Sequence, residues 1–102
     1  MAIRIMSSIF SGASIYKTKS VDVACKISKT FDKEVMIALS KFMRLDYGET
    51  SYEDKLINDD ALLHCDRVIA TYETVRGKIW IIAESEDGKQ YNSITVLFPS
   101  EY

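Results

Sequence analysis

Histidine, cysteine and glycine are all scarce in this chain, and their scarcity excludes several classes of protein. The only histidine is His64, so any histidine-based acid–base scheme has to use it. The sequence has no glycine-rich phosphate loop, no nucleophile elbow and no paired-cysteine zinc spacing. Two cysteines are too few for a disulfide framework, and no apolar run reaches the length of a membrane span. We therefore expect a cytoplasmic protein that is not an enzyme, has no catalytic residues and does not enter a membrane.

The length and composition are those of one globular domain. The chain has 102 residues, of which 47% are apolar and 27% charged. A chain of this size can bury one core without disulfide or metal staples. We expect residues 1–102 to form a single domain.

The first thirty residues are expected to form strands. Apolar residues between Ile3 and Tyr16, interrupted by Ser11-Gly12, indicate a short strand pair. Apolar and polar residues then alternate over residues 21–27, which predicts a further strand. In that strand Cys25 would face the core beside Val23 and Ile27.

The periodicity changes to that of a helix after Thr30. Apolar residues recur at three- and four-residue steps over residues 31–44, which predicts an amphipathic helix capped by Thr30. Gly48 breaks the pattern. Thr50 followed by Glu53 indicates a capping box that opens a second helix over residues 51–64. Leu56, Ala61 and Leu63 are expected on its buried side and the acids on its outer side.

The last third of the sequence predicts a three-stranded antiparallel meander. Its segments "RVIATYE", "KIWIIAES" and "NSITVLF" are rich in β-branched and aromatic residues, and Asp87-Gly88 is a signal for a two-residue hairpin. The predicted fold is α+β, an antiparallel sheet of three to five strands with two helices on one face. Residues 31–102 would be the helix-helix-three-strand body, and residues 1–30 a variable N-terminal strand region.

Charge is distributed unevenly along the chain, although the net charge is only −2. Residues 1–44 carry a net charge of +5, whereas residues 45–66 carry seven acids and one lysine, a net charge of −6. Such a segment is either a solvated helix face or a surface that attracts a basic partner. Tyrosines anchor protein interfaces, and Tyr47 and Tyr52 adjoin these acids, whereas Trp80 is expected in the core. The predicted partner-binding residues are Asp46, Tyr47, Glu49, Tyr52, Glu53, Asp54, Asp59 and Asp60.

The stretch "LLHCDR" places the only histidine beside a cysteine. Cys25, His64, Cys65 and Asp60 (or Asp66) form a chemically sensible set of zinc ligands, although their spacing matches no established motif. The competing interpretation is that Cys25 is a small core residue and that His64 ends a helix. On that interpretation the protein has no cofactor, and both alternatives stay open from the sequence alone.

The lysines of the N-terminal half do not predict a nucleic-acid surface. They fall in different predicted elements and lack interleaved aromatics, whereas a nucleic-acid footprint gathers its charges on one face. These residues are Lys17, Lys19, Lys26, Lys29, Lys33 and Lys41. We expect no direct nucleic-acid binding. A small hydrolase that uses His64 as its base is the remaining enzymatic alternative.

The order of motifs from Phe31 to Tyr102 resembles a family of small proteins carried by plasmids, integrative elements and prophages of Gram-positive bacteria. The most specific motifs are the Asp46-Tyr47-Gly48-Glu49 turn, Glu53-Asp54, the "GKIWII" strand and the "LFPSEY" ending. The family usually has tryptophan where this chain has Tyr47, and Cys-Pro where it has Ser51-Tyr52. The "HCD" and "EDGKQYN" segments are also departures, so a metal site would belong to this branch alone.

The resemblance implies a setting rather than a chemistry, because genes of this kind travel with anti-restriction and anti-CRISPR genes. This setting, together with the acidic segment and its tyrosines, leads to the hypothesis of an anti-CRISPR protein that binds a type II RNA-guided effector nuclease in the bacterial cytoplasm. Such nucleases hold their heteroduplex in a positively charged channel, which is complementary to an acidic face. The alternative is a helper or regulator of the mobile element that associates with DNA through the basic N-terminal half.

Overall fold

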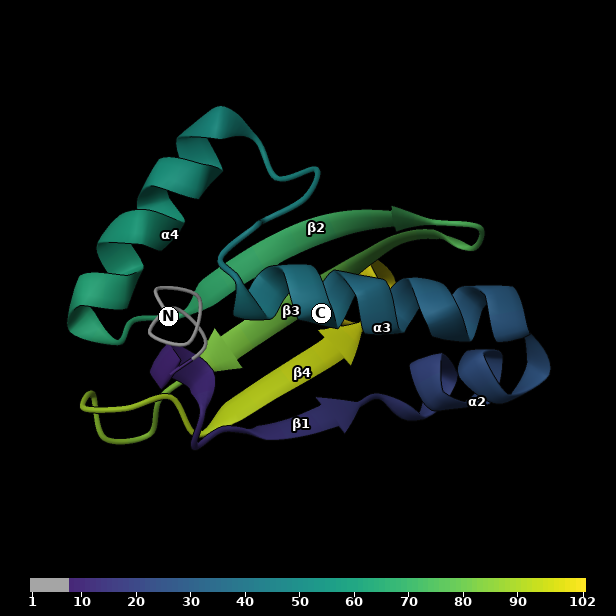
Figure 1. Ribbon diagram of the computed structural model, residues 1–102, viewed down its shortest axis with the longest axis horizontal. Helices are drawn as coiled ribbons and strands as arrows, with labels where there is room; N and C mark the ends of the chain where they lie inside the picture. Colours follow the sequence, from purple (N-terminus) through teal and green to yellow (C-terminus); the bar gives the residue numbers. More distant parts are fainter. Residues whose placement is uncertain (1–7) are drawn as a thin grey trace.

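The computed structural model describes residues 8–102, which form three α-helices and an open four-stranded mixed sheet (Figure 1). The α+β class is therefore confirmed. In chain order the elements are η1 (Ser8–Phe10), β1 (Ser14–Lys17), α2 (Lys19–Ile27), α3 (Lys29–Met43), α4 (Tyr52–His64), β2 (Val68–Thr74), β3 (Gly77–Glu84), β4 (Ser93–Leu97) and η2 (Pro99–Glu101).

The C-terminal meander is confirmed, but the sheet as a whole is not antiparallel. Strands β2, β3 and β4 pair antiparallel in sequence order, and β1 adds to the outer side of β4 in parallel, which gives the order β1-β4-β3-β2. The predicted strand at Ile15 and Tyr16 therefore exists as β1. Its predicted pairing partner was wrong at Ile9 and Phe10, which belong to the 3-10 helix η1, and the rest of that segment, at Ile3 and Ile5, lies outside the described residues.

The two meander connections differ from each other. A two-residue turn joins β2 to β3, and Gly77 follows it with φ +90°, a conformation that glycine adopts without strain. The β3–β4 connection spans residues 85–92, so the predicted two-residue hairpin at Asp87-Gly88 was wrong. The Asp87 carboxylate instead accepts hydrogen bonds from the Lys89 and Gln90 amides, which makes a longer local turn.

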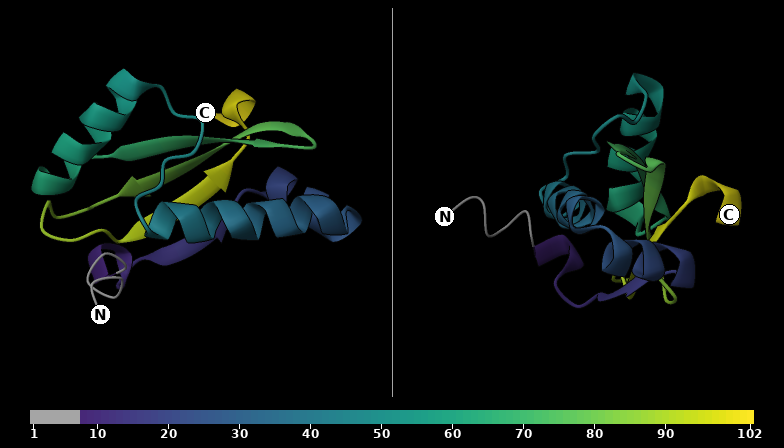
Figure 2. Two further views of the ribbon diagram at one scale, coloured as in Figure 1. Left: turned by 45° about the horizontal axis from the view of Figure 1, so that its top comes forward. Right: turned by 90° about the vertical axis from the view of Figure 1, so that its right-hand side faces the viewer.

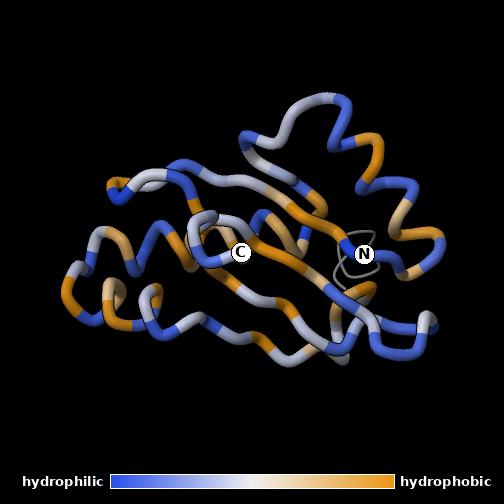
Figure 3. Tube along the Cα trace, turned by 180° about the vertical axis from the view of Figure 1, so that it is seen from behind, coloured by the Kyte–Doolittle hydropathy of each residue, from blue (hydrophilic) through white to orange (hydrophobic). Residues whose placement is uncertain are grey.

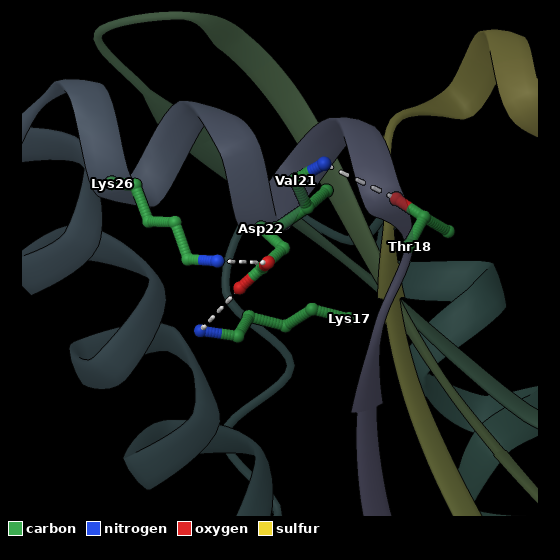
Figure 4. A network of polar contacts seen from close by, with 5 residues as sticks. All are labelled: Lys17, Thr18, Val21, Asp22 and Lys26. Atoms are coloured by element: carbon green, nitrogen blue, oxygen red, sulfur yellow. Dashed lines mark hydrogen bonds and ion pairs between the residues drawn. The ribbon is translucent and has the colours of Figure 1, made fainter.

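Residues 19–27 form helix α2, so the strand predicted there was wrong. The Thr18 hydroxyl caps the helix by accepting a hydrogen bond from the Val21 amide (Figure 4). The buried residues are Val21, Ala24 and Cys25, at helical spacing, whereas Val23 and Ile27 are 44% and 71% exposed. Cys25 is buried as expected, but on a helix and without the two neighbours predicted for it.

Helix α3 supplies the main helical contribution to the core. It begins one residue after Ser28, whose hydroxyl accepts from the Phe31 amide, so the predicted Thr30 cap was wrong by two positions. Its buried face consists of Phe31, Val35, Ala38 and Phe42. Helix α3 lies on one side of the sheet, and the C-terminal turn η2 lies on the other (Figure 2). Helix α2 lies beyond the end of β1, and its Thr18 cap donates to the Glu101 carboxylate of η2.

Helix α4 lies beside the β2 edge rather than on the sheet face with α3, so the prediction of two helices on one face was wrong in its arrangement (Figures 1 and 2). Its cap is Ser51, which accepts from the Asp54 amide, rather than Thr50. Thr50 is buried, and its hydroxyl is occupied elsewhere. The helix ends at Cys65, which has the left-handed conformation typical of a C-terminal cap.

Trp80 is half-buried, and the prediction that it lies in the core was wrong. Along β3 the core-facing positions are Ile79, Ile81 and Ala83, so Trp80 projects from the opposite sheet face. There its ring packs edge-on against Tyr102, with ring centroids 5.4 Å apart. The C-terminal residue therefore partly covers this face.

Candidate functional site

The eight predicted partner-binding residues lie in one continuous region, the loop after α3 and helix α4. All six carboxylates are exposed: Asp46, Glu49, Glu53, Asp54, Asp59 and Asp60. Among residues 8–102, none of these six forms an ion pair. Their negative charge is therefore not neutralised locally and is available to a cationic partner.

Tyr47 was predicted to be a surface anchor, and that prediction was wrong, because its side chain is only 4% exposed. Its hydroxyl donates to the Asp59 carboxylate at 3.3 Å, which ties the loop to α4. Burial, reinforced by the Asp59 charge, raises the pKa of Tyr47 well above its ordinary value. Tyr72 fixes the same loop from β2 by donating to the Asp46 carbonyl oxygen at 2.7 Å.

Gly48 lets this loop approach the sheet closely. It forms an isolated bridge with Thr71 and has φ +61°. A Cβ atom at this position would lie 2.4 Å from the Tyr72 ring. The residue at this point of the turn therefore has to be glycine for both steric and conformational reasons.

Helix α4 is attached to the edge of β2 mainly by hydrogen bonds. The buried Asn58 side chain donates to the Ile69 carbonyl oxygen at 2.9 Å and accepts from the Ile69 amide at 3.2 Å. Tyr91 secures the C-terminal end, where its hydroxyl donates to the Asp66 carbonyl oxygen at 2.7 Å. Only Asn58 and Ala61 of this helix are buried.

The side of α4 opposite Asn58 is a mixed apolar and acidic surface. At 3.6 residues per turn, seven exposed residues share this side, and they are here called the α4 outer face: Tyr52, Glu53, Leu56, Ile57, Asp60, Leu63 and His64. Tyr52, Leu56, Ile57 and Leu63 are 72%, 51%, 62% and 79% exposed. Hydrophobic and hydrophilic residues alternate along the helix (Figure 3). The sequence predicted Leu56, Ala61 and Leu63 on the buried side of this helix. Ala61 is buried, but the prediction was wrong for Leu56 and Leu63, because Asn58 and Ala61 face the sheet edge and turn both leucines outward.

A cleft of about 270 Å³ lies between α4 and the sheet, beside this face. Ile57, Ile69 and Trp80 give it apolar walls, and Asp54 and Arg67 also line it. Arg67 forms an ion pair with Glu84 at 3.3 Å and also donates to the Tyr102 hydroxyl. No sequence signal marked this cleft, since its walls come from three separate elements.

The four residues considered as zinc ligands are not gathered into one site. Cys25 belongs to α2, whereas Asp60, His64 and Cys65 belong to α4 and its cap, and these helices lie at opposite ends of the structure (Figure 1). Within residues 8–102, no group of three or more histidine, cysteine or acidic side chains is arranged to hold a metal ion. Burial raises the pKa of the Cys25 thiol, which disfavours the thiolate that zinc requires.

His64 has a local partner. It is exposed, and its Nδ1 atom lies 3.1 Å from the Asp60 carbonyl oxygen one turn earlier in the helix. This contact accounts for its position at the helix end, where a cation also favours the dipole.

The lysines of the N-terminal half lie on β1, α2 and α3, and two of them share one acid. Asp22 forms ion pairs with Lys17 at 3.8 Å and with Lys26 at 3.1 Å (Figure 4). Their charge is therefore partly neutralised within the chain, which reduces their attraction for phosphate.

Comparisons with known proteins identify no relative of this chain. No family model, no curated protein and no solved structure matches it. Across residues 8–102, no helix is both long enough and apolar enough to cross a membrane.

Proposed function

We propose that this protein is an inhibitor that acts by binding another protein through the α4 outer face and the acids beside it. The observation that carries the proposal is the exposure of four large apolar side chains on a helix that is anchored from its other side. Several large apolar side chains exposed on one face of a helix, among polar residues, are typical of a protein-binding site. The acids around it form no ion pairs among residues 8–102, so the surface favours a partner with a basic surface.

The partner that we propose is the effector nuclease of a type II CRISPR system, which makes this protein an anti-CRISPR protein. The support for this step is the resemblance to mobile-element proteins together with charge complementarity, since such a nuclease holds its nucleic acids in a basic channel. In this role Tyr52, Leu56 and Leu63 would pack against the nuclease, and Glu53 and Asp60 would face its cations. The activity requires no catalytic residue, and the protein would act in the bacterial cytoplasm.

A binding and cleavage assay tests the proposal. Purified protein is mixed with the nuclease and its guide RNA, captured, and then assayed for cleavage of target DNA. We expect a complex and reduced cleavage, and both should weaken as salt rises. Absence of a complex together with undiminished cleavage would contradict the proposed partner.

A charge-reversal pair locates the surface. Glu53→Lys combined with Asp60→Lys should lower the association rate at least about tenfold, since complementary charge steers encounter. The matched control is Glu73→Lys combined with Glu86→Lys, which makes the same change in net charge outside α4. Equal loss in both variants would mean that net charge rather than the α4 outer face controls binding.

A mobility-shift assay on random duplex DNA separates this proposal from the DNA-associated alternative. Binding that weakens steeply with salt would favour a regulator of the mobile element, because phosphate neutralisation releases counterions. We expect no shift at physiological salt.

A further inference from the structure

The two edges of the sheet are closed to different extents. At the β2 edge, Ile69 and Thr71 turn their main-chain groups outward, and both residues have partners. Asn58 bonds to the amide and the carbonyl of Ile69. The Glu49 amide donates to the Thr71 carbonyl oxygen at 2.8 Å, and the Thr71 amide donates to the Thr50 hydroxyl at 2.9 Å. The edge is therefore blocked against a further strand along Ile69 and Thr71, the part of β2 beside α4.

The β1 edge has no such cover among residues 8–102. Strand β1 pairs only with β4, and the amides of Ser14 and Thr18 donate toward that strand, to the carbonyl oxygens of Asn92 and Val96. Since main-chain groups alternate in direction along a strand, the amides and carbonyls of Ile15 and Lys17 point away from the sheet. Two donors and two acceptors are therefore presented at this edge.

The side chains of β1 do not block this edge either. Ile15 and Tyr16 are 49% and 55% exposed, although both are residues that favour strands. A lysine commonly protects an edge strand by its charge. Here the Lys17 ammonium turns toward Asp22 on α2, 3.8 Å away (Figure 4).

We propose that a second copy of this chain pairs with β1, antiparallel, about a two-fold axis at Tyr16. The outward residues Ile15 and Lys17 flank Tyr16 symmetrically, so the axis places Ile15 of each copy opposite Lys17 of the other. Residues directly opposite in this way exchange two hydrogen bonds, so each copy's two outward donors and two outward acceptors are all satisfied. A second copy meets this edge with the same edge of its own, so one exposed strand supplies both sides of a closed two-fold contact and leaves no further edge open there.

The pairing extends the sheet to eight strands and brings two tyrosines together. Tyr16 lies opposite Thr95 in the β1–β4 register, on the sheet face away from α3. The two Tyr16 rings would be a directly opposed cross-strand pair on that face, an arrangement that stabilises antiparallel strands. Because β1 and β2 are opposite edges, the α4 outer face stays free in the dimer, and the inference does not depend on the proposed function.

The mass of the full chain in solution tests the pairing. Light scattering or sedimentation is measured over concentrations up to about 1 mM, a range that populates weak complexes. We expect the average mass to rise from 11.6 kDa toward twice that value. A mass that stays at the monomer value throughout would overturn the proposal.

Two substitutions at one position distinguish main-chain pairing from side-chain contact. Ile15→Pro removes an outward N–H and leaves the bonds to β4 in place, which is the edge position that proline tolerates. It should raise the dimer dissociation constant at least about thirty-fold, since two hydrogen bonds are lost per dimer. Ile15→Thr keeps the N–H and should still dimerise. Dimerisation of the proline variant with unchanged affinity would overturn the proposal.

Hydrogen exchange of the unaltered protein gives a readout that does not depend on how a variant folds. The Ile15 and Lys17 amides should become more protected as concentration rises, whereas the Tyr16 amide, bonded to β4, should be protected throughout. Protection of Ile15 and Lys17 that does not change with concentration would mean that one chain covers its own edge. Exchange at the unprotected rate at every concentration would mean that nothing covers it, and either result overturns the proposal.

Discussion

The two longest helices of this protein are held by different kinds of interaction. Helix α3 buries four apolar side chains against the sheet, and Phe42 stacks on Phe10 with ring centroids 5.0 Å apart. Helix α4 buries only Ala61 and the polar Asn58, and hydrogen bonds from Asn58 and Tyr91 hold it at the sheet edge. Apolar burial thus fixes one helix, and polar anchoring fixes the other.

The difference matters for function because the residues that stabilise the fold and the residues exposed on α4 are largely different. Most of the apolar side chains of α4 point away from the protein, where they contribute little to folding. Their identity can therefore be set by a binding partner without loss of the fold. The buried side chains of α3 cannot be changed in this way, because each methylene removed from the core leaves a cavity.

The largest effect is expected from truncating the α3 core. Phe42→Ala removes a fully buried ring and should destabilise the protein by about 3–5 kcal/mol, since the lost transfer energy adds to a cavity cost. Urea unfolding followed by circular dichroism measures it. Met36→Ala, on the exposed side of the same helix, is the control and should change stability by less than about 0.5 kcal/mol. A loss below about 1 kcal/mol in the Phe42 variant would contradict the role given to α3.

The next largest effect should come from the polar anchor of α4. Asn58→Ala leaves the Ile69 amide and carbonyl without partners and should cost about 1–3 kcal/mol. Hydrogen exchange of the Ile69 amide should accelerate at the same time, which distinguishes local loss of the anchor from a global effect. The matched control is Asp60→Ala, which changes an exposed residue two positions after Asn58 on the same helix. If Asn58→Ala lowered the unfolding free energy no more than this control does, the Asn58 side-chain amide would not be what holds α4.

The difference between the helices also explains how far the sequence could predict the structure. Helix α3, the body of α4 and the meander have strong local patterns, and all three were predicted. Residues 21–27 were predicted as a strand because Val21 and Cys25 fit both an alternating and a helical pattern, and seven residues do not separate the two. The parallel pairing of β1 could not be predicted, since its partner lies more than 75 residues later in the chain.

For the candidate site, the acids were predicted to be exposed and are exposed, because charge burial is rare at any position. The burial of Tyr47 was missed, since it depends on the close approach that Gly48 allows. The anchoring role of Asn58 was also missed, although a polar residue opposite the apolar outer side of a helix is a signal that could have indicated it.

Alkaline pH should weaken the polar anchoring more than the apolar packing. Burial raises the pKa of Tyr91 to about 12, above its ordinary value of 10.0. The native state therefore binds the phenolic proton more tightly than the unfolded state does. This contribution to stability is complete below about pH 10 and is lost as the pH rises toward 12, at about 1.4 kcal/mol per pH unit. Tyr47 and Tyr72 act in the same direction.

Tyr91→Phe isolates one tyrosine from the general alkaline effect. The variant should be less stable than the unaltered protein near pH 8, by about 1 kcal/mol, because it lacks the hydrogen bond to Asp66. It should also lose less stability on going to pH 11, so the difference between the two unfolding free energies changes by about 1.4 kcal/mol, which closes the gap or slightly reverses it. Tyr52→Phe, at an exposed tyrosine, should follow the unaltered protein at both pH values. Parallel pH profiles for Tyr91→Phe and the unaltered protein would show that the buried hydroxyl does not couple to folding.

The smallest effect on stability is expected on the α4 outer face. Leu63 is 79% exposed, so Leu63→Ala should change the unfolding free energy by less than about 0.5 kcal/mol. The same variant should weaken binding to the proposed nuclease at least about tenfold, because a large apolar side chain that becomes buried against a partner can contribute more than 1 kcal/mol there. Val75→Ala, at the exposed β2–β3 turn, should change neither quantity. A destabilisation above about 1 kcal/mol in Leu63→Ala would mean that the chain itself uses this face, whereas unchanged nuclease binding would remove Leu63 from the proposed surface.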